Sequence, residues 1–360
     1  PEWGTVSNIE PSLHDPSVVF LTVDFHQIGN NRPYIYRSRD GGTSWTKITS
    51  GIPESTHSYV HVVREDPSRP GMLYAGTENA LYVSFDAGDN WMPVQDNLPP
   101  DPVHWLEVQP DFNEQVVATY GRGFWIMDDI TPLQRMTPEE HAADMHLFAP
   151  RPTYGFLSKE RQQGSYEGAQ GTNPEYGASL HVLVGEAAGR RQAVVNIRDE
   201  GGTTLRTLQA SIAPGLNRIQ WDLREDASRT PKLRTPPLEH EHVDLNGNGW
   251  RSPPEGGRVQ PSVPPGTYTV EVTAGDWSAT TELRVLKDPN AEGTDADVRA
   301  QVAMVRQLRD ETNQVTDLID EIEWVRKSID DVQARIADDA LRLRGVSPDT
   351  VLAQSRSVDD

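Results

Sequence analysis

The chain has 360 residues, enough for about two or three domains. Its 54 acidic and 33 basic residues give a net charge of −21, which argues against nucleic acid and anionic membrane surfaces as partners. It has no cysteine, so disulfides, a thiol nucleophile and Cys-ligated zinc are excluded. No apolar run reaches the ~18 residues of a spanning helix, and we expect a protein that does not span a membrane.

Residues 1–135 predict a repeating β structure. Short β-type runs, among them SVVFLTVDF, MLYAGT and GFWIMD, are separated by turn residues. Residues 60–86 align with residues 103–129 without a gap, and a weaker third copy precedes them. Each copy holds four strand-length segments in about 45 residues, which is the size of a propeller blade.

Two copies carry the pattern Ser-x-Asp-x-Gly-x-x-Trp between the third and fourth strands. An Asp before glycines favours a tight turn, because its carboxylate accepts backbone N–H groups and Gly tolerates positive φ. The Trp begins the fourth strand, where it can pack between neighbouring blades. We interpret both boxes as structural fasteners. Their residues are Ser38, Asp40, Gly42 and Trp45, then Ser84, Asp86, Gly88 and Trp91.

This pattern resembles the Asp-box (BNR) repeat of sialidases, sortilin-type receptors and two-propeller xyloglucanases. VHWLEVQPDFNEQVVATYGRGFWIMDDITPL also resembles a last blade of bacterial BNR-repeat proteins of the sortilin type. The resemblance implies a β-propeller, of which residues 1–135 supply about three blades, the third without a fourth strand. A propeller closes with four or more blades. We therefore expect the other blades from another chain or from the N-terminal part of a cleaved precursor, since the chain begins at Pro1 rather than Met.

The rest of the chain changes character twice. Residues 136–290 alternate apolar and polar residues between Gly and Pro turns, with an inserted loop at 231–262, and predict an antiparallel sandwich. This region resembles the Ig-like domains that follow bacterial propellers. Residues 294–343 predict one long helix whose apolar stripe needs a partner, either the propeller or another helix. Residues 344–360 form a tail. The predicted fold class is mainly β: a partial Asp-box propeller, an Ig-like sandwich and a long C-terminal helix.

Strand parity predicts where a binding site lies. If the four strands of each blade follow one another, the Asp boxes lie at one end of the sheets. The loops 24–33, 50–58, 76–80, 96–104 and 119–123 then lie at the other end. We expect ligand-binding residues among those they carry: His26, Arg32, His57, Glu78, Asn79, His104, Tyr120 and Arg122.

The chemistry of these loops leaves two functions open. Sialidases need three arginines and a Tyr nucleophile backed by an acid, and their Arg-Ile-Pro signature is absent. A xyloglucanase-like glycosidase needs two carboxylates across a cleft, and Asp24, Glu78 and Asp101 are available. The leading hypothesis is a non-catalytic recognition or scaffold protein, secreted, periplasmic or on the cell surface, that binds a peptide or glycan. The alternative is a carbohydrate-active hydrolase with part of its site in missing blades.

One further motif predicts a metal. DLNGNGWRSPPE fits the calcium-loop pattern D-x-[DN]-x-[DN]-G-x5-E. Asp244, Asn246, Asn248 and Glu255 would supply oxygens to Ca²⁺. Prolines rule out the exiting helix of an EF-hand, so an Asx-turn loop without calcium stays open beside the calcium interpretation. His240 and His242 beside it are a weak transition-metal pair.

Overall fold

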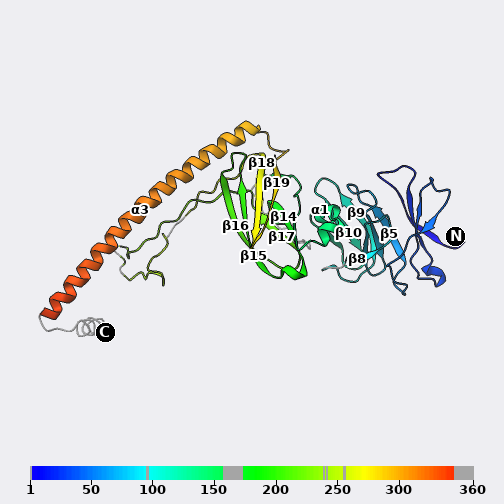
Figure 1. The fold of residues 1–360 in the computed structure, drawn as a ribbon, viewed down its shortest axis with the longest axis horizontal. Coiled ribbons are helices and arrows are strands. Elements are labelled where there is room, and N and C mark those ends of the chain that lie inside the picture. Colours follow the sequence, from blue (N-terminus) through cyan, green and yellow to red (C-terminus); the bar gives the residue numbers. More distant parts are fainter. Residues whose placement is uncertain are drawn as a thin grey trace.

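The computed structural model describes residues 2–94, 97–156, 173–237, 240, 242–253 and 257–343. The predicted fold class is confirmed: the protein is mainly β, with three blade-type sheets, a two-sheet sandwich and one long C-terminal helix. These parts follow one another along the long axis of the molecule (Figure 1). No described helix is long and apolar enough to cross a membrane.

The first two sheets are four-stranded antiparallel blades in which each strand pairs with the next along the chain. The Asp boxes lie in the hairpins between the third and fourth strands. The first sheet comprises β1 (Thr5–Pro11), β2 (Val19–Asp24), β3 (Ile35–Ser38) and β4 (Thr46–Lys47). The second comprises β5 (Val60–Glu65), β6 (Leu73–Thr77), β7 (Leu81–Ser84) and β8 (Met92–Val94).

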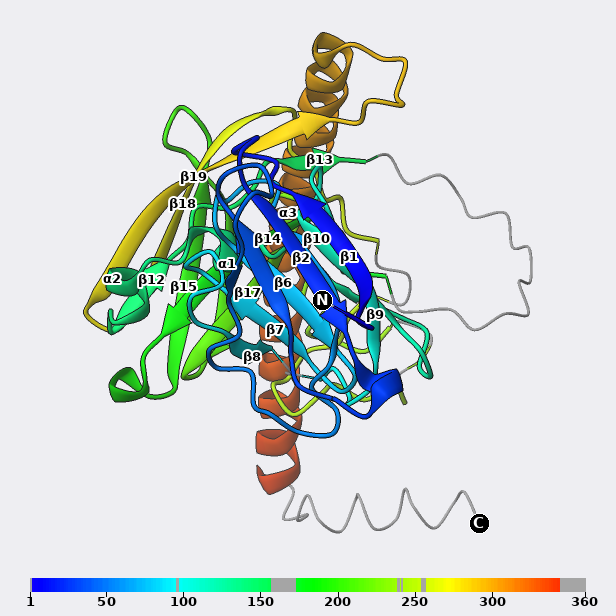
Figure 2. The same ribbon diagram turned by 90° about the vertical axis from the view of Figure 1, so that its right-hand side faces the viewer.

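The third sheet has three strands, β9 (Val103–Gln109), β10 (Glu114–Thr119) and β11 (Phe124–Met127). The sheets pack face to face, and Figure 2 looks along the stack with the first sheet in front and α3 behind. Gly76 allows this close packing, because a Cβ there would stand 2.5 Å from the carbonyl oxygen of Val103 in the third sheet.

The box tryptophans show how neighbouring sheets are joined. Trp91 of the second box is 4% exposed in the core shared with the first sheet, and its indole donates to the carbonyl oxygen of Ile48. Trp45 of the first box has no described sheet on its outer side and is 39% exposed. The same residue in the same motif is therefore buried only where an adjacent blade exists.

The two boxes have the same hydrogen bonds. In the first, Oδ1 of Asp40 accepts the Ser38 hydroxyl and the N–H of Ser44, each at 2.8 Å. Hydrogen bonds to Ser44 and Ser38 lower the pKa of Asp40 to about 2. In the second, Asp86 accepts from Ser84 and from the N–H of Asn90, again at 2.8 Å. Each carboxylate thus closes its own turn.

The blades join the sandwich through a buried polar junction. After β11, Asp129 takes a positive φ of 54°, and its carboxylate accepts the hydroxyl of Thr131 at the start of the short helix α1 (Thr131–Arg135); α2 (Pro138–His141) follows. The Asp129 carboxylate lies 4.0 Å from His181 of the sandwich. Burial, aided by the charges of Arg218 and Arg151, lowers the pKa of His181 to about 4. The imidazole is therefore neutral near pH 7.

The sandwich has a three-stranded sheet in the order β12-β14-β17 and a five-stranded sheet in the order β13-β19-β18-β15-β16. Inward-facing Val, Ile and Leu from both sheets enclose the fully buried Trp221. The strands are β12 (Met145–Leu147), β13 (Thr153–Gly155), β14 (Ala178–Val184), β15 (Arg191–Arg198), β16 (Thr204–Ile212), β17 (Gly215–Trp221), β18 (Gly266–Ala274) and β19 (Trp277–Lys287), with the 3₁₀ turn η2 (Glu186–Ala188) before β15.

The last element is α3 (Asp295–Leu343), which extends away from the sheets (Figure 1). Thr294 accepts the N–H of Asp297, whose carboxylate accepts the N–H of Thr294 in return. This reciprocal pair satisfies donors that a helix N-terminus leaves open. The buried Glu225 carboxylate holds the helix to the sandwich by pairing with Arg306 and Arg309.

The second Asp box gives a stability prediction. Asp86→Ala leaves the N–H of Asn90 and the Ser84 hydroxyl without their acceptor, so we expect the free energy of unfolding to fall by about 1–2 kcal/mol. Asp86→Asn keeps an acceptor oxygen and should lose less. Urea unfolding followed by tryptophan fluorescence measures both changes. An Asp86→Ala protein as stable as the parent would contradict the fastener role.

Candidate functional site

Each blade-type sheet carries one extra residue near the start of its first strand. The pairing of β1 with β2 skips Ser7, that of β5 with β6 skips His61, and that of β9 with β10 skips His104. Such β-bulges occur next to binding sites, where they re-aim a side chain. The same irregularity in three consecutive sheets places these residues at the end of the sheets opposite the Asp boxes.

Histidine and tyrosine rings form a continuous row across this end. We call His26, Tyr59, His61, His104 and Tyr120 the ring row. His26, in the 3₁₀ turn η1 (His26–Ile28), stacks on Tyr59 with centroids 4.7 Å apart, and Tyr59 meets His61 edge-on at 5.2 Å. His61 stacks on His104 at 4.2 Å, and His104 on Tyr120 at 5.3 Å. The row therefore links all three sheets.

Two carboxylates lie along the ring row. Asp24 contacts Nδ1 of His26, and Glu78 lies 2.9 Å from Nε2 of His61. Burial lowers the pKa of His61 although the Glu78 charge opposes it, so this imidazole is neutral near pH 7. Burial raises the pKa of Tyr59, and its hydrogen bond to Glu78 raises it further. The row thus places the neutral His61 imidazole and the Tyr59 phenol beside two carboxylates.

Four of the eight predicted ligand-binding residues come together here. His26, His104 and Tyr120 belong to the ring row, and Glu78 pairs with its central histidine. Their exposure differs, because Tyr120 is 80% exposed at one end while Glu78 is partly buried. The hairpins β2–β3, β6–β7 and β10–β11 supply three of them, as strand parity predicts.

The other four predicted residues make their contacts elsewhere. Arg32 pairs with Glu54 at 3.2 Å between two exposed side chains, and Nδ1 of His57 lies 3.0 Å from the Thr56 hydroxyl. Asn79 accepts from Thr77 inside its own hairpin. Arg122 is exposed at the tip of the β10–β11 hairpin, and its backbone N–H donates to the Thr119 hydroxyl.

Sequence reasoning left out Tyr59 and His61, the centre of the ring row. The signal was present, because the gapless repeat places the Val-His pair of residues 60–61 on that of residues 103–104. A histidine repeated at one blade position marks a repeated location in space. Both residues lie at the start of a strand, and we expected the site in loops.

The calcium-loop residues lie outside the ring row. The Oδ1 of Asn246 accepts the N–H groups of Asn248 and Trp250 at 2.9 and 3.4 Å, and Gly249 has a φ of 77°. These contacts form an Asx turn. Asp244 is described, whereas Glu255 lies outside the described residues. Calcium binding here stays a prediction. His240 and His242 have their ring centroids 5.7 Å apart.

Comparison with solved structures finds distant similarities. An ancestral GH74 enzyme is 14% identical, with a TM-score of 0.29 over 57% of this chain and 27% of that one. The GH74 enzyme of Niastella koreensis is 11% identical, with a TM-score of 0.30 over 78% of this chain and 46% of that one. The extracellular domain of a hybrid two-component system from B. thetaiotaomicron is 13% identical, with a TM-score of 0.23 over 74% and 30%.

No family model matches the chain. No curated protein matches it either. The chain spans less than half the length of each of the three solved structures, with coverages of 27%, 46% and 30%. The function therefore has to come from the chemistry of the site.

Calcium binding by the loop at 244–255 is directly measurable. Two Asn ligands in place of Asp lower the charge of the site, so we expect a dissociation constant of about 10⁻⁴–10⁻³ M. Isothermal titration of the intact chain with Ca²⁺ should show one site that Asp244→Ala removes and that the exposed Asp276→Ala, elsewhere in the sandwich, retains. No heat at millimolar calcium would leave the loop a plain Asx turn.

Proposed function

We propose that this chain is a non-catalytic recognition or scaffold protein of the Asp-box, sortilin-like type. Its ligand, a glycan or a peptide, binds along the ring row at the end of the sheets opposite the Asp boxes. The observation that supports this proposal is the row itself, five His and Tyr rings in continuous contact across three sheets.

The ring row has the properties of a recognition surface. Tyr is enriched at interfaces because it combines a large apolar ring with a polar tip. Tyr120 is 80% exposed at one end of the row, so one face of its ring can accept an apolar sugar face or a side chain. Asp24 and Glu78 supply acceptors for ligand hydroxyl or amide groups. A ligand would contact strands and hairpins of three rigid sheets at once.

Each of the two carboxylates already bonds to neighbouring rings, and this favours binding over hydrolysis. Asp24 is engaged by His26, and Glu78 by His61 and Tyr59. A hydrolase remains the second candidate, because both charges lie near enough to Tyr59 to raise its pKa, after burial and the Glu78 hydrogen bond. Retaining glycosidases hold their two carboxyl groups about 5–5.5 Å apart. In that reading, further blades would supply part of the site.

Uncovered apolar surface supports the proposal that further blades complete the propeller. At the outer side of the first sheet, Trp3 is 84% exposed and Trp45 39%. On the third sheet, Phe124 and Ile126 of the edge strand β11 are 78% and 57% exposed. Large apolar patches of this kind mark interfaces. The blades would come from another chain or from the same precursor, outside the cytoplasm, where Asp-box proteins of this type act.

Tyr120 tests the recognition proposal. We expect Tyr120→Ala to weaken binding at least tenfold for whichever ligand is selected from a glycan array or a displayed peptide library, because truncating an interface aromatic costs about 1–2 kcal/mol or more. Calorimetric titration measures the loss. Tyr176→Ala in the sandwich is the matched control and should bind like the parent.

Two results would contradict this function. One is equal affinity of the Tyr120→Ala protein and the parent for every selected ligand. The other is release of reducing sugar from a bound glycan that stops in Glu78→Gln while binding persists. The second result would assign the site to the hydrolase.

A further inference from the structure

Three metal-ligating side chains converge at the centre of the ring row. The nearest donor atoms of His61, Glu78 and His104 all lie within 4.8 Å of one another. The two histidines occupy the bulges of adjacent sheets, and Glu78 comes from the β6–β7 hairpin between them. Two imidazole nitrogens and one carboxylate are the ligands of zinc sites that keep a fourth position open.

We propose that His61, Glu78 and His104 bind a zinc ion. Ligands of a tetrahedral zinc at about 2.1 Å stand about 3.3 Å apart. Glu78 and His61 already lie 2.9 Å apart, so the main adjustment falls to the exposed His104, whose ring has to turn out of its stack on His61 to aim a nitrogen at the ion. Tyr59 hydrogen-bonds the Glu78 carboxylate, as groups behind metal-bound carboxylates commonly do.

The zinc proposal deepens the recognition proposal and rests on it for its biological meaning, because the open position would take an oxygen of the ligand. Zinc binding itself is measured without any ligand. A protein that binds zinc but no glycan or peptide would keep the metal site and lose the recognition function. A protein that binds a glycan or peptide but no zinc would keep the recognition function and lose the metal site.

Zinc binding is tested on the intact chain. Calorimetric titration with Zn²⁺ should show one site, and zinc should raise the melting temperature because it binds only the folded state. His104→Ala should weaken binding at least tenfold, and His61→Asn together with His104→Ala should abolish it. Circular dichroism confirms that the variants fold. The matched controls, His57→Ala and His240→Ala, should bind zinc like the parent.

Co²⁺ gives a second readout. It should produce visible absorption bands of a four- or five-coordinate site in the parent, and these bands should be absent in the double variant. Either of two results overturns the proposal: no zinc binding at 100 µM, or zinc binding that survives in the double variant.

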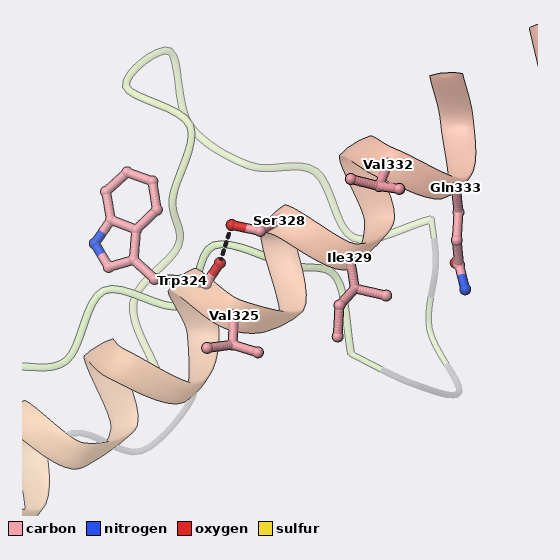
Figure 3. Close-up of a pocket in the computed structure, with 6 residues that line it drawn as sticks. All are labelled: Trp324, Val325, Ser328, Ile329, Val332 and Gln333. Atoms are coloured by element: carbon pink, nitrogen blue, oxygen red, sulfur yellow. Dashed lines mark hydrogen bonds between the residues drawn. The ribbon is translucent and has the colours of Figure 1, made fainter. Parts of the chain in front are cut away.

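A second inference comes independently from α3. From Val315 to Ile336 every first and fourth position of a seven-residue repeat is apolar and at least half exposed. We call these seven residues the heptad seam: Val315, Leu318, Ile322, Val325, Ile329, Val332 and Ile336. Figure 3 shows Val325 and Ile329 projecting from the same side of the helix. A seam with this 3.5-residue period is the signature of a coiled coil.

The opposite face of α3 is polar and already contacts another segment of the chain. The backbone N–H groups of Lys232 and Arg234 donate to Asp320 and Glu323 at 2.7 and 2.6 Å. Arg229 pairs with Asp317. The 229–235 segment therefore runs along the polar face of the helix (Figure 1). This docking orients the helix so that its seam points to solvent.

We propose that the heptad seam pairs with that of a second copy of this chain as a parallel two-stranded coiled coil. All first positions of the repeat are β-branched, which favours two parallel strands where Leu holds the fourth position, as Leu318 does; Val325 and Val332 hold the other two fourth positions. In that register Glu321 of one helix faces Arg326 of the other, at positions that set orientation; Arg326 also pairs with Glu323 of its own helix at 2.6 Å. Three heptads of buried Ile, Val and Leu would remove the apolar surface that the monomer leaves in water.

Mass measurement tests the pairing. Light scattering of the parent at about 100 µM should give twice 40.1 kDa. Ile322→Lys with Ile329→Lys should restore the monomer, since each copy would place two charges in the seam. Ala334→Lys with Ala337→Lys adds the same charge off the seam and should stay dimeric. A monomeric or trimeric parent overturns the proposal, as does a seam variant that remains dimeric.

The absence of cysteine makes orientation testable. In a parallel pair residue 329 of one helix faces residue 329 of the other, so Ile329→Cys should form an intermolecular disulfide under mild oxidation. Lys327→Cys, on the outer face, should not. Cross-linking of neither variant, or of both equally, would overturn the parallel arrangement.

Discussion

The candidate site depends on a single irregularity of strand pairing that is repeated in each blade-type sheet. An extra residue in the first strand interrupts the ladder at Ser7, His61 and His104. Without it, residues of a strand alternate strictly between the two faces of a sheet, and both faces of the second sheet are packed against neighbouring sheets. The bulge lets the rings of His61 and His104 leave the packed faces at that end. Adjacent sheets then bring the two histidines into stacking contact.

The stacking of sheets is in turn fixed at their other end. Trp91 leaves its own turn and enters the core shared with the first sheet, while Asp86 closes the turn from which it emerges. The fastening boxes and the candidate site thereby lie at opposite ends of each sheet. The box sets the distance between sheets, and the ring contacts of the ring row depend on that distance. Trp45 shows the consequence of a missing neighbour, because the same motif leaves it partly exposed.

In the C-terminal half, polar contacts within the chain and the exposed apolar seam likewise lie on different faces of α3. The sandwich holds α3 through the buried Glu225 carboxylate, and the 229–235 segment covers the polar face of the helix. Charged and amide groups are satisfied within the chain, whereas the apolar seam is left outward. A scaffold that recognises a ligand at one end and pairs at the other would gain avidity, since two linked sites bind a repetitive ligand more tightly than either alone.

The sequence by itself determined the elements whose signals are local. Alternation and turn residues predicted the strands, apolar residues recurring every three or four positions predicted the long helix, and the Asp boxes marked their own hairpins, because each depends on residues close in the chain. Parity also placed His26, Glu78, His104 and Tyr120 at one end of the sheets, opposite the Asp boxes. Only the tertiary structure decided that Tyr59 and His61 lie between them, and that Arg32 and His57 turn elsewhere. The ring contacts between sheets join His26 to Tyr59 and His61 to His104, far apart in the chain, and no local pattern encodes which ring meets which.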